Sequence, residues 1–437
     1  MVPSFRSRRV VLPDGTRPAT VRHEAGLVVE IGEGMADEDF GDLVVMPGLV
    51  DSHVHVNDPG RANWEGFQSA TRAAAAGGTT TIVDMPLNSI PPTVDPEALG
   101  VKRAAAAEAI AVDVAFWGGL VPGSEPHLPA LVEAGVCGFK AFLVDSGVPE
   151  FPPLSFDQLE NALPELARLG VPLLLHAEDP ARLHPMTGDP RSYVRYLESR
   201  PPECEAEAIS EAMSRAAPTG AHIHILHVSS GDAAGVLRGA GPGVSAETCP
   251  HYLTFTAEQV GMGATEFKCA PPIRSVGHRE ALWEALADGT LAMIVSDHSP
   301  SPPGLKEVES GDFGAAWGGI SSLQIRLQAT WTEASRRGFG LDRLREWLST
   351  APARLAGLER KGAIATGMDA DFLVWDPDGR TEVVGAGLQH RHPLTPYEGM
   401  RLRGKVQKVT LGGQTLFTPE GGVHSPGGSM LERGWPT

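Results

Sequence analysis

The chain has 437 residues, 42% of them hydrophobic and 21% charged, which suits a globular protein with one large α/β domain plus something smaller, or two to three domains. Its 54 acidic residues exceed its 36 Lys and Arg, and the net charge of -18 argues against nucleic acid or an anionic membrane surface as a partner. No apolar run approaches the roughly 18 residues of a membrane span, and no signal peptide is recognisable. Four scattered cysteines without a C-x-x-C motif favour reduced thiols and a cytoplasmic location.

Strand and helix patterns alternate along most of the chain. Residues 1–45 carry short apolar runs broken by Gly, Pro and Asp, which indicate small antiparallel strands. The apolar run 46–55 then begins a series of eight expected strands, separated by stretches with helical patterns. The other strands are expected at 79–85, 112–117, 138–144, 171–176, 222–228, 244–249 and 291–297. Helices are expected at 69–76, 129–134, 156–169, 204–216 and 278–287, and within 321–336 and 341–358.

Eight strands alternating with helices predict an α/β fold, a TIM-like (β/α)8 barrel. After about residue 360 the strand-and-turn pattern returns, at 362–376, 405–411 and 414–418. We therefore expect a barrel over 46–359 and a small β-sandwich domain formed by 1–45 together with 360–437. The Gly- and Pro-rich tail after Pro419 is expected to be irregular.

Three His-X-His pairs occur in the chain, although chance predicts roughly half of one. Side chains alternate across a strand, so the members of such a pair face the same side. Spacing alone does not say which pair binds a metal. In a (β/α)8 barrel, however, active residues lie at the carboxyl ends of the strands. The three pairs are His53/His55, His222/His224 and His390/His392.

The strand-end rule selects one of these pairs and rejects two. His222 and His224 have the opposite parity to His227, so we expect them to face the helix layer in a structural role. The third pair lies in a Pro-rich connector outside the barrel and is not expected to bind metal. A single histidine after an apolar run is often only a hydrogen-bonded core residue, but six candidates at one rim predict a binuclear metal site. The six are His53, His55, Lys140, His176, His227 and Asp297.

Lys140 is the unusual member of this set. A lysine normally extends its amine to water, and an ammonium beside two divalent cations would be strongly repelled. Loss of a proton and reaction with carbon dioxide would resolve the conflict, because the resulting carbamate is anionic and can bridge two metals. With Asp297 and a bridging hydroxide, it would bring the charge of the metal cluster to about +1. We therefore predict an N6-carboxylated Lys140.

Together these residues resemble the amidohydrolase superfamily, in its subtype with a binuclear site and a carboxylated lysine. The resemblance covers nearly the whole chain, including Gly362-X-Ile-X-X-Gly-X-Asp-Ala-Asp371. Within it the chain is most similar to the cyclic amidases, and among these to the allantoinases. Dihydroorotases carry an arginine for a substrate carboxylate where this chain has Asn57, and hydantoinases carry a tyrosine that is missing from 141–155.

Longer stretches also look like allantoinase signatures, although the hydantoinases or dihydropyrimidinases and the dihydroorotases remain alternatives. Asp58 and Asn63 depart from the pattern, at positions that should not touch the chemistry. A non-catalytic scaffold on the same barrel is a more remote alternative, and such relatives have lost metal ligands. The stretches are 58–61, 64–67, 84–93, 268–274 and 317–320.

The resemblance implies hydrolysis of the ring amide of allantoin by a hydroxide that bridges two metals. Asp297 would pass a proton from this hydroxide to the leaving nitrogen. One ion would lie between His53, His55, Lys140 and Asp297, and the other between His176, His227 and Lys140. Zn²⁺ is expected, with Co, Mn or Fe as alternatives.

The substrate is expected to be a small molecule, allantoin or a related hydantoin. Its hydantoin and ureido groups would meet backbone near Cys269 and Gly318 and the amide of Asn88, unless Asn88 only forms a turn. His251 and His298 would either support the metal ligands or be purely structural. The resemblance also implies a homotetramer.

Overall fold

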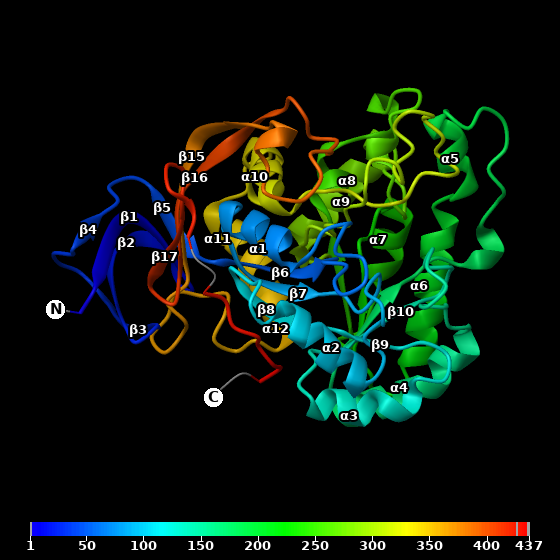
Figure 1. Ribbon diagram of the computed structural model, residues 1–437, viewed down its shortest axis with the longest axis horizontal. Coiled ribbons are helices and arrows are strands. Elements are labelled where there is room, and N and C mark those ends of the chain that lie inside the picture. The colour runs from blue at the N-terminus through cyan, green and yellow to red at the C-terminus, as the bar shows by residue number, and fades with distance from the viewer. Residues whose placement is uncertain (1, 425–426, 435–437) are drawn as a thin grey trace.

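The computed structural model describes residues 2–424 and 427–434 and contains a parallel barrel beside a second, mostly antiparallel sheet (Figure 1). Two backbone hydrogen bonds join the two parallel sheets into one closed barrel: Cys137 N donates to Phe116 O at 2.9 Å, and His55 N donates to His298 O at 2.8 Å. The expected TIM-like barrel is therefore confirmed. Its strands are β6 (Leu49–Val54), β7 (Thr79–Asp84), β8 (Asp113–Phe116) with the short β9 (Gly118–Gly119), β10 (Phe139–Phe142), β11 (Leu173–His176), β12 (Ile223–Ile225), β13 (Val244–Thr248) and β14 (Met293–Ile294).

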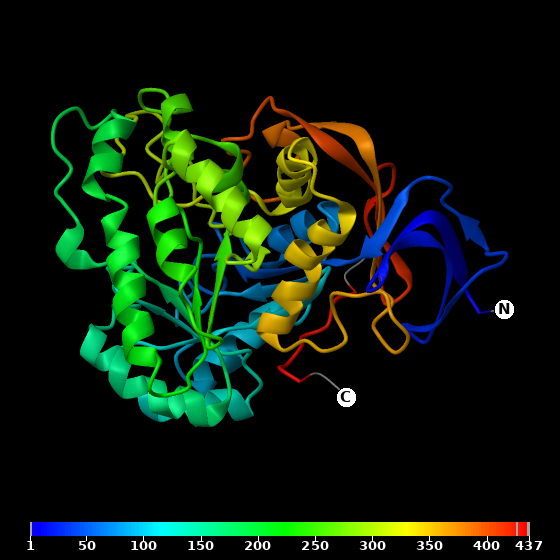
Figure 2. The same ribbon diagram turned by 180° about the vertical axis from the view of Figure 1, so that it is seen from behind.

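Helices surround this barrel, and the views from both sides show them on its outer face (Figures 1 and 2). Helix α4 (Phe156–Leu169) has the predicted bounds because both of its ends are capped. Ser155 and Gln158 form a reciprocal capping box at the start, and Gly170 takes a φ of 66° at the end. The other helices are α1 (Phe67–Ala76), α2 (Pro96–Ala106), α3 (Leu128–Glu133), α5 (Tyr193–Ser199), α6 (Glu203–Ala216), α7 (Gly231–Leu237), α8 (Pro250–Thr254), α9 (Val276–Asp288), α10 (Arg326–Arg336), α11 (Leu341–Arg345) and α12 (Ala351–Ala356), with a π-helical turn at Glu346–Thr350.

The second sheet is built from both ends of the chain, as predicted. Strand β5 pairs with β1 on one side and, antiparallel, with β15 on the other, where Val45 lies opposite Val374. A small core of its own lies beneath this sheet and includes Phe5, Val21 and Phe372. The strands are β1 (Ser4–Leu12), β2 (Gly15–Glu24), β3 (Leu27–Gly32), β4 (Glu38–Asp39), β5 (Val44–Pro47), β15 (Phe372–Glu382), β16 (Arg401–Leu411), β17 (Gln414–Thr418) and β18 (Gly422–Val423).

The prediction was incomplete in the short elements. Helices α2, α5, α7 and α8 were not predicted, and the last barrel strand has two residues instead of the expected seven. The tail after Pro419 is more regular than expected. It contains β18, and Leu431 N donates to Val114 O at 2.8 Å, so this part of the tail lies along β8. Residues 425–426 and 435–437 of the predicted tail lie outside the described residues.

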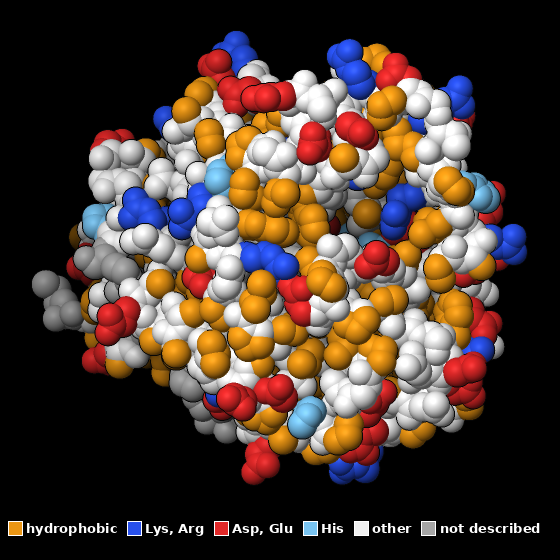
Figure 3. Space-filling view, turned by 45° about the vertical axis from the view of Figure 1, so that its right-hand side comes forward, with side chains coloured by type: hydrophobic (Ala, Val, Ile, Leu, Met, Phe, Trp, Pro, Cys, Tyr) orange, Lys and Arg blue, Asp and Glu red, His pale blue; other side chains and the backbone are white. Residues whose placement is uncertain are grey.

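The distribution of charged side chains on the surface agrees with the acidic composition. On the face in Figure 3, Lys and Arg side chains are scattered in small groups among acidic and hydrophobic ones. Within the described ranges, no helix has both the length and the apolar character that crossing a bilayer requires.

Candidate metal centre

The structure brings all six predicted strand-end residues to one mouth of the barrel. Five of them line a single pocket there, and the sixth, His53, lies beneath it in contact with two of the others. This is the arrangement that the strand-end rule predicts, because the carboxyl ends of the barrel strands meet at one rim. The residues lie in or shortly after β6 (His53, His55), β10 (Lys140), β11 (His176), β12 (His227) and β14 (Asp297).

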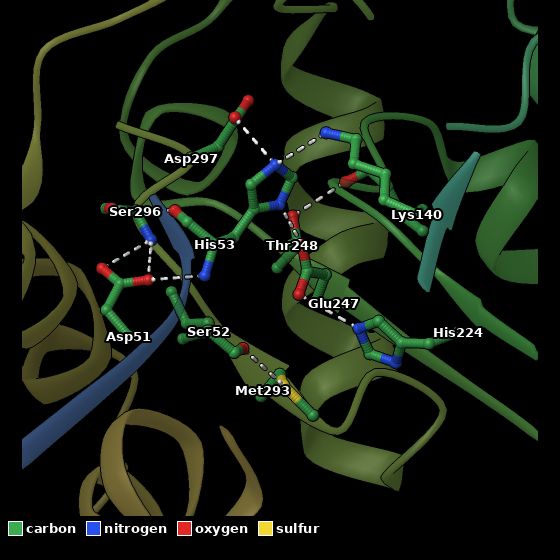
Figure 4. Close-up of polar contacts among 12 residues, drawn as sticks. Asp51, Ser52, His53, Lys140, His224, Glu247, Thr248, Met293, Ser296 and Asp297 are labelled. Carbon is green, nitrogen blue, oxygen red and sulfur yellow. Dashed lines mark hydrogen bonds and ion pairs between the residues drawn. The ribbon is translucent and has the colours of Figure 1, made fainter. Parts of the chain in front are cut away.

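Asp297 stands at the centre of one group of potential ligands. Its Oδ1 lies 3.1 Å from His53 Nε2 and 3.7 Å from His55 Nε2. Lys140 Nζ approaches the same Nε2 from another direction, at 3.4 Å (Figure 4). Four side chains from three separate strands therefore converge on one point.

His176 and His227 form a second group directly beside the first. Their ring centroids are 4.6 Å apart, and the His227 ring lies 5.4 Å from that of His53. Phe142 stacks on His176 at 4.7 Å with an interplanar angle of 20°, which limits rotation of that imidazole. The two groups are close enough to hold a pair of neighbouring ions.

The backbone at these strand ends is unusual. His227 and Asp297 have φ angles of 38° and 44°, and Asn57 and Asn88, also at this end of the barrel, have 65° and 62°. Positive φ is uncommon outside glycine and costs about 1–3 kcal/mol in sparsely populated regions. Four such residues at one end of the barrel, three of them lining the pocket, indicate that the loops hold these side chains in fixed directions.

His224 does not face the helix layer, so the prediction from its parity in the strand is wrong. His224 is fully buried, and its Nε2 lies 3.0 Å from Glu247 Oε2, while Glu247 Oε1 lies 2.6 Å from His53 Nδ1 (Figure 4). The error has a physical reason. Strand β12 ends at Ile225 and the left-handed turn at His227 follows, so alternation along the strand does not extend to residue 227. His222, which is partly exposed, contacts Ser245 as a structural residue would.

Two buried carboxylates that contact the candidate ligands were missed by the sequence reasoning. Glu247 contacts His53, and Glu178 Oε2 lies 2.7 Å from His176 Nε2. Both carboxylates are fully buried. The contact of Glu178 could have been predicted, because Glu178 lies only two residues after His176. The contact of Glu247 could not, because Glu247 and His53 are far apart in the sequence. Such partners fix the ring orientation of a metal-binding histidine.

Burial also sets the protonation state of the four histidines. Desolvation lowers the pKa of His53, His55, His176 and His227, and the nearby Lys140 lowers each of them further. All four are therefore neutral at pH 7, with a nitrogen lone pair free to bind a cation.

The pKa values of Lys140 and Asp297 are shifted toward each other. Burial lowers the pKa of the Lys140 amine to about 8, and burial raises the pKa of the Asp297 carboxyl to about 8 although Lys140 opposes this shift. A buried amine in this range is partly neutral near physiological pH, and a neutral amine is a nucleophile.

The three predicted substrate contacts line the same pocket as the candidate ligands. Asn88 Nδ2 donates to Asn57 Oδ1 at 2.9 Å, which leaves Asn88 Oδ1 without a partner. The Cys269 carbonyl already accepts from the Tyr196 hydroxyl at 2.7 Å and has one lone pair left. Gly318 faces Ala270, in the loop that contains Cys269.

Comparisons with known proteins agree with this geometry. The Amidohydrolase family matches residues 44–416. The chain belongs to the amidohydrolase family. It is 50% identical to Allantoinase from Streptomyces avermitilis, with 98% of each chain covered. It is 44% identical to Allantoinase from Arabidopsis thaliana, over 94% of this chain and 87% of that protein, and 41% identical to Allantoinase from Saccharomyces cerevisiae, over 96% of each.

Solved structures of other amidohydrolases have the same fold. An L-hydantoinase (dihydropyrimidinase) from Arthrobacter aurescens superposes with a TM-score of 0.92 and 30% identity, over 99% of this chain and 100% of that one. A dihydropyrimidinase from Brevibacillus agri superposes with a TM-score of 0.90 and 28% identity, over 99% of each chain. The barrel with its small β domain is thus the fold of these cyclic amidases.

The residues of this amidohydrolase fit a divalent metal. Ligand atoms of His53, His55 and Asp297 all lie within 4.8 Å of one another. In addition, the buried Nδ1 atoms of His55 and His227 have no hydrogen-bond partner within the protein. Buried polar atoms are rarely left unpaired, so a ligand for them is expected. Together with the family, these groups establish divalent metal use.

The remaining histidines differ in their surroundings. His298 Nδ1 accepts a hydrogen bond from Ser322 N at 3.2 Å, and its carbonyl accepts one from His55 N. His298 therefore fixes the backbone of a candidate metal ligand. His251 is fully buried with both ring nitrogens unpartnered. His392 is partly exposed and contacts Asn63 O, while His390 is buried with its ring 5.7 Å from that of His298.

Proposed function

We propose that this protein hydrolyses the cyclic amide of allantoin to give allantoate, in ureide catabolism. The supporting observation is that near-full-length relatives with 41–50% identity are named allantoinase. In addition, one pocket is lined by five of the six predicted metal ligands and by the three predicted substrate contacts. The substrate is then a small molecule that enters from the barrel mouth.

Two ions are proposed to lie side by side at this mouth. His53, His55, Asp297 and Lys140 would hold one, and His176 and His227 with Lys140 the other. The contacts of Asp297 with His53 and His55, and the contact between His176 and His227, support this division. Zn²⁺ is the first candidate because histidine and carboxylate are its common ligands, although Co, Mn or Fe would also be accepted.

Lys140 is proposed to carry a carboxyl group on its amine. The ammonium first loses one proton. The neutral amine then attacks the carbon of carbon dioxide, a C=O π bond opens as the N–C bond forms, and a second proton leaves the nitrogen, so the original cation becomes an anion. Burial favours this reaction because it lowers the pKa of the amine to about 8. The carbamate would offer one oxygen to each ion, and its negative charge would suit a site with two cations.

The reaction itself requires a nucleophile, a polarised carbonyl and a proton carrier. When bound, the two divalent ions supply ionised water at neutral pH and polarise the amide carbonyl. Asp297 accepts the proton of the attacking water and delivers it to the ring nitrogen as the C–N bond breaks. Asp297 lines the pocket that would receive the substrate, which supports this role.

Substrate orientation is assigned to three neutral groups. The unpartnered Oδ1 of Asn88 can accept from a ring or ureido N–H, as can the second lone pair of the Cys269 carbonyl. Gly318 presents its backbone to the same pocket. Asn57 is neutral and already bonded to Asn88, which suits a substrate without a carboxylate.

A hydantoinase or dihydropyrimidinase activity is the second candidate, because the structural relatives with TM-scores of 0.92 and 0.90 carry those names. A substrate panel of allantoin, hydantoin, dihydrouracil and dihydroorotate decides between them. The protein should be assayed with its metal quantified and bicarbonate supplied. We expect the highest kcat/KM on allantoin, and no turnover of allantoin would reject the proposal.

The organisation of the molecule is proposed as well. We assign residues 46–359 to the catalytic barrel and 1–45 with 360–437 to the β-sandwich domain. A homotetramer in the cytoplasm is proposed, and the four free, buried cysteines support the reducing compartment.

A further inference from the structure

The two halves of the candidate metal centre are supported by different buried carboxylates. Glu247 contacts His53, whereas Glu178 contacts His176. Glu178 lies two residues beyond the end of β11, and Glu247 lies inside β13. A substitution that removes the Glu178–His176 contact therefore leaves the Glu247–His53 contact in place, and the reverse also holds.

An arginine holds the second of these carboxylates. Arg200 donates from Nε to Glu178 Oε1 at 3.1 Å and from Nη2 to Oε2 at 2.9 Å. This is the two-pronged geometry in which a guanidinium fixes the plane of a carboxylate. Glu178 is fully buried, while the Arg200 side chain is 20% exposed and lines the pocket beside His176.

A second arginine extends the support to His227. Arg274 Nη1 donates to the backbone carbonyl of Arg200 at 2.9 Å, and Arg274 Nη2 donates to Glu205 Oε2 at 2.9 Å. Glu205 in turn accepts from the backbone N–H of Ser229 at 2.9 Å, two residues after His227. Arg274 Nε also donates to Ser229 Oγ at 3.0 Å.

We propose that Arg200 and Arg274 are positioning residues for the ion held by His176 and His227. The continuous set of bonds from His176 through Glu178 and the two arginines to the His227 loop carries this inference, which rests on the proposed function because it needs that ion. Groups that orient a metal-binding histidine typically contribute about 10–100-fold to metal affinity. The ion on the His53 side should be much less sensitive.

The test compares Arg200→Gln and Arg200→Lys with the wild-type protein. Each protein is loaded with Zn²⁺ and bicarbonate, dialysed against a graded series of chelator concentrations, and its metal content per chain is measured. We expect two ions in the wild type. In Arg200→Gln one ion should leave at a chelator concentration about 10–100-fold lower, while the other is retained as in the wild type.

Arg200→Lys should lose this ion at a chelator concentration between those of Arg200→Gln and the wild type, because a lysine restores the charge but not the forked geometry. Arg274→Lys is a second variant, and it should loosen the same ion. An anomalous-scattering map of partly stripped Arg200→Gln should place the remaining ion beside His53 and His55.

The control is Lys408→Met, which removes the ion pair with the exposed Glu38 in the sheet formed by the chain ends, away from the barrel mouth. It should retain both ions as tightly as the wild type. Equal loosening of both ions in the Arg200 variants, or unchanged affinity for both, would overturn the inference. A wild-type protein that does not bind two ions would instead reject the proposed function.

Discussion

At the scale of single residues, the burial of Lys140 sets the conditions under which the centre can assemble. An ammonium cannot attack carbon dioxide, whereas the neutral amine can. Burial lowers the pKa of Lys140 to about 8, so the reactive fraction grows as the pH rises toward that value and levels off above it. The four histidines are neutral throughout this range, because burial lowers their pKa values.

This predicts a pH-dependent activation of metal-free protein. When Zn²⁺ is added at a fixed concentration of dissolved carbon dioxide, the initial rate at which activity appears should rise roughly tenfold between about pH 6.5 and pH 8, with little further increase above about pH 9. Aliquots assayed at a single pH separate activation from turnover. An activation rate that falls with rising pH would contradict the role of the neutral amine.

Asn88 offers a second prediction, because a turn residue and a substrate contact respond differently to glycine. The φ of 62° suits glycine, so Asn88→Gly keeps the backbone while it removes the amide. Loss of one hydrogen bond to substrate should raise KM for allantoin about 2–10-fold, since such a bond contributes about 0.5–1.5 kcal/mol. If Asn88 only forms the turn, KM will match that of the wild type, and only the lost hydrogen bond to Asn57 will show, as a lower unfolding temperature.

At the scale of elements, a buried lysine ties the barrel to the sheet formed by the chain ends. Lys361 Nζ lies 2.5 Å from Asp113 in β8 and 2.7 Å from Asp371 just before β15, and it also pairs with Asp369 at 2.8 Å. All these side chains are nearly buried. The contact joins two elements that are far apart in the sequence.

Lys361→Met should therefore destabilise the protein strongly. Breaking a buried ion pair by removing one partner costs about 3–5 kcal/mol, because the remaining charges stay buried without compensation. Urea unfolding followed by circular dichroism measures the loss. The matched control is Lys408→Met, whose pair with the exposed Glu38 should contribute about 0–1 kcal/mol. Equal losses in the two variants would contradict the assigned role.

The elements also show what the sequence could and could not predict. Long capped helices such as α4 and the apolar barrel strands carried strong local signals. Helix α7 did not, because Gly231–Leu237 is short and contains two glycines, which disfavour a helix. The rule that active residues lie at the ends of barrel strands predicted where the candidate ligands lie. The predicted orientation of His224 was wrong, because strand alternation stops at Ile225. Partners such as Glu247 come from distant strands, so no local pattern could reveal them.

At the scale of the whole molecule, the proposed metal centre would join five barrel strands that are separated by long stretches of sequence. Ions that bind only the folded chain stabilise it by RT ln(1 + [L]/Kd), which is about 4 kcal/mol at a thousandfold excess over Kd. Chelation should therefore lower the thermal midpoint by several degrees, while the far-ultraviolet circular dichroism stays native. A midpoint that is unaffected by chelation would argue against ions that link the strands.

The most direct measurement is a crystal structure of protein grown with zinc and bicarbonate, with anomalous diffraction recorded on both sides of the zinc absorption edge. We expect two anomalous peaks, one beside His53, His55 and Asp297 and one beside His176 and His227. Continuous density should extend from Lys140 Nζ between them. A bare amine at Lys140 with no anomalous peak at the barrel mouth would contradict the proposed centre and the chemistry built on it.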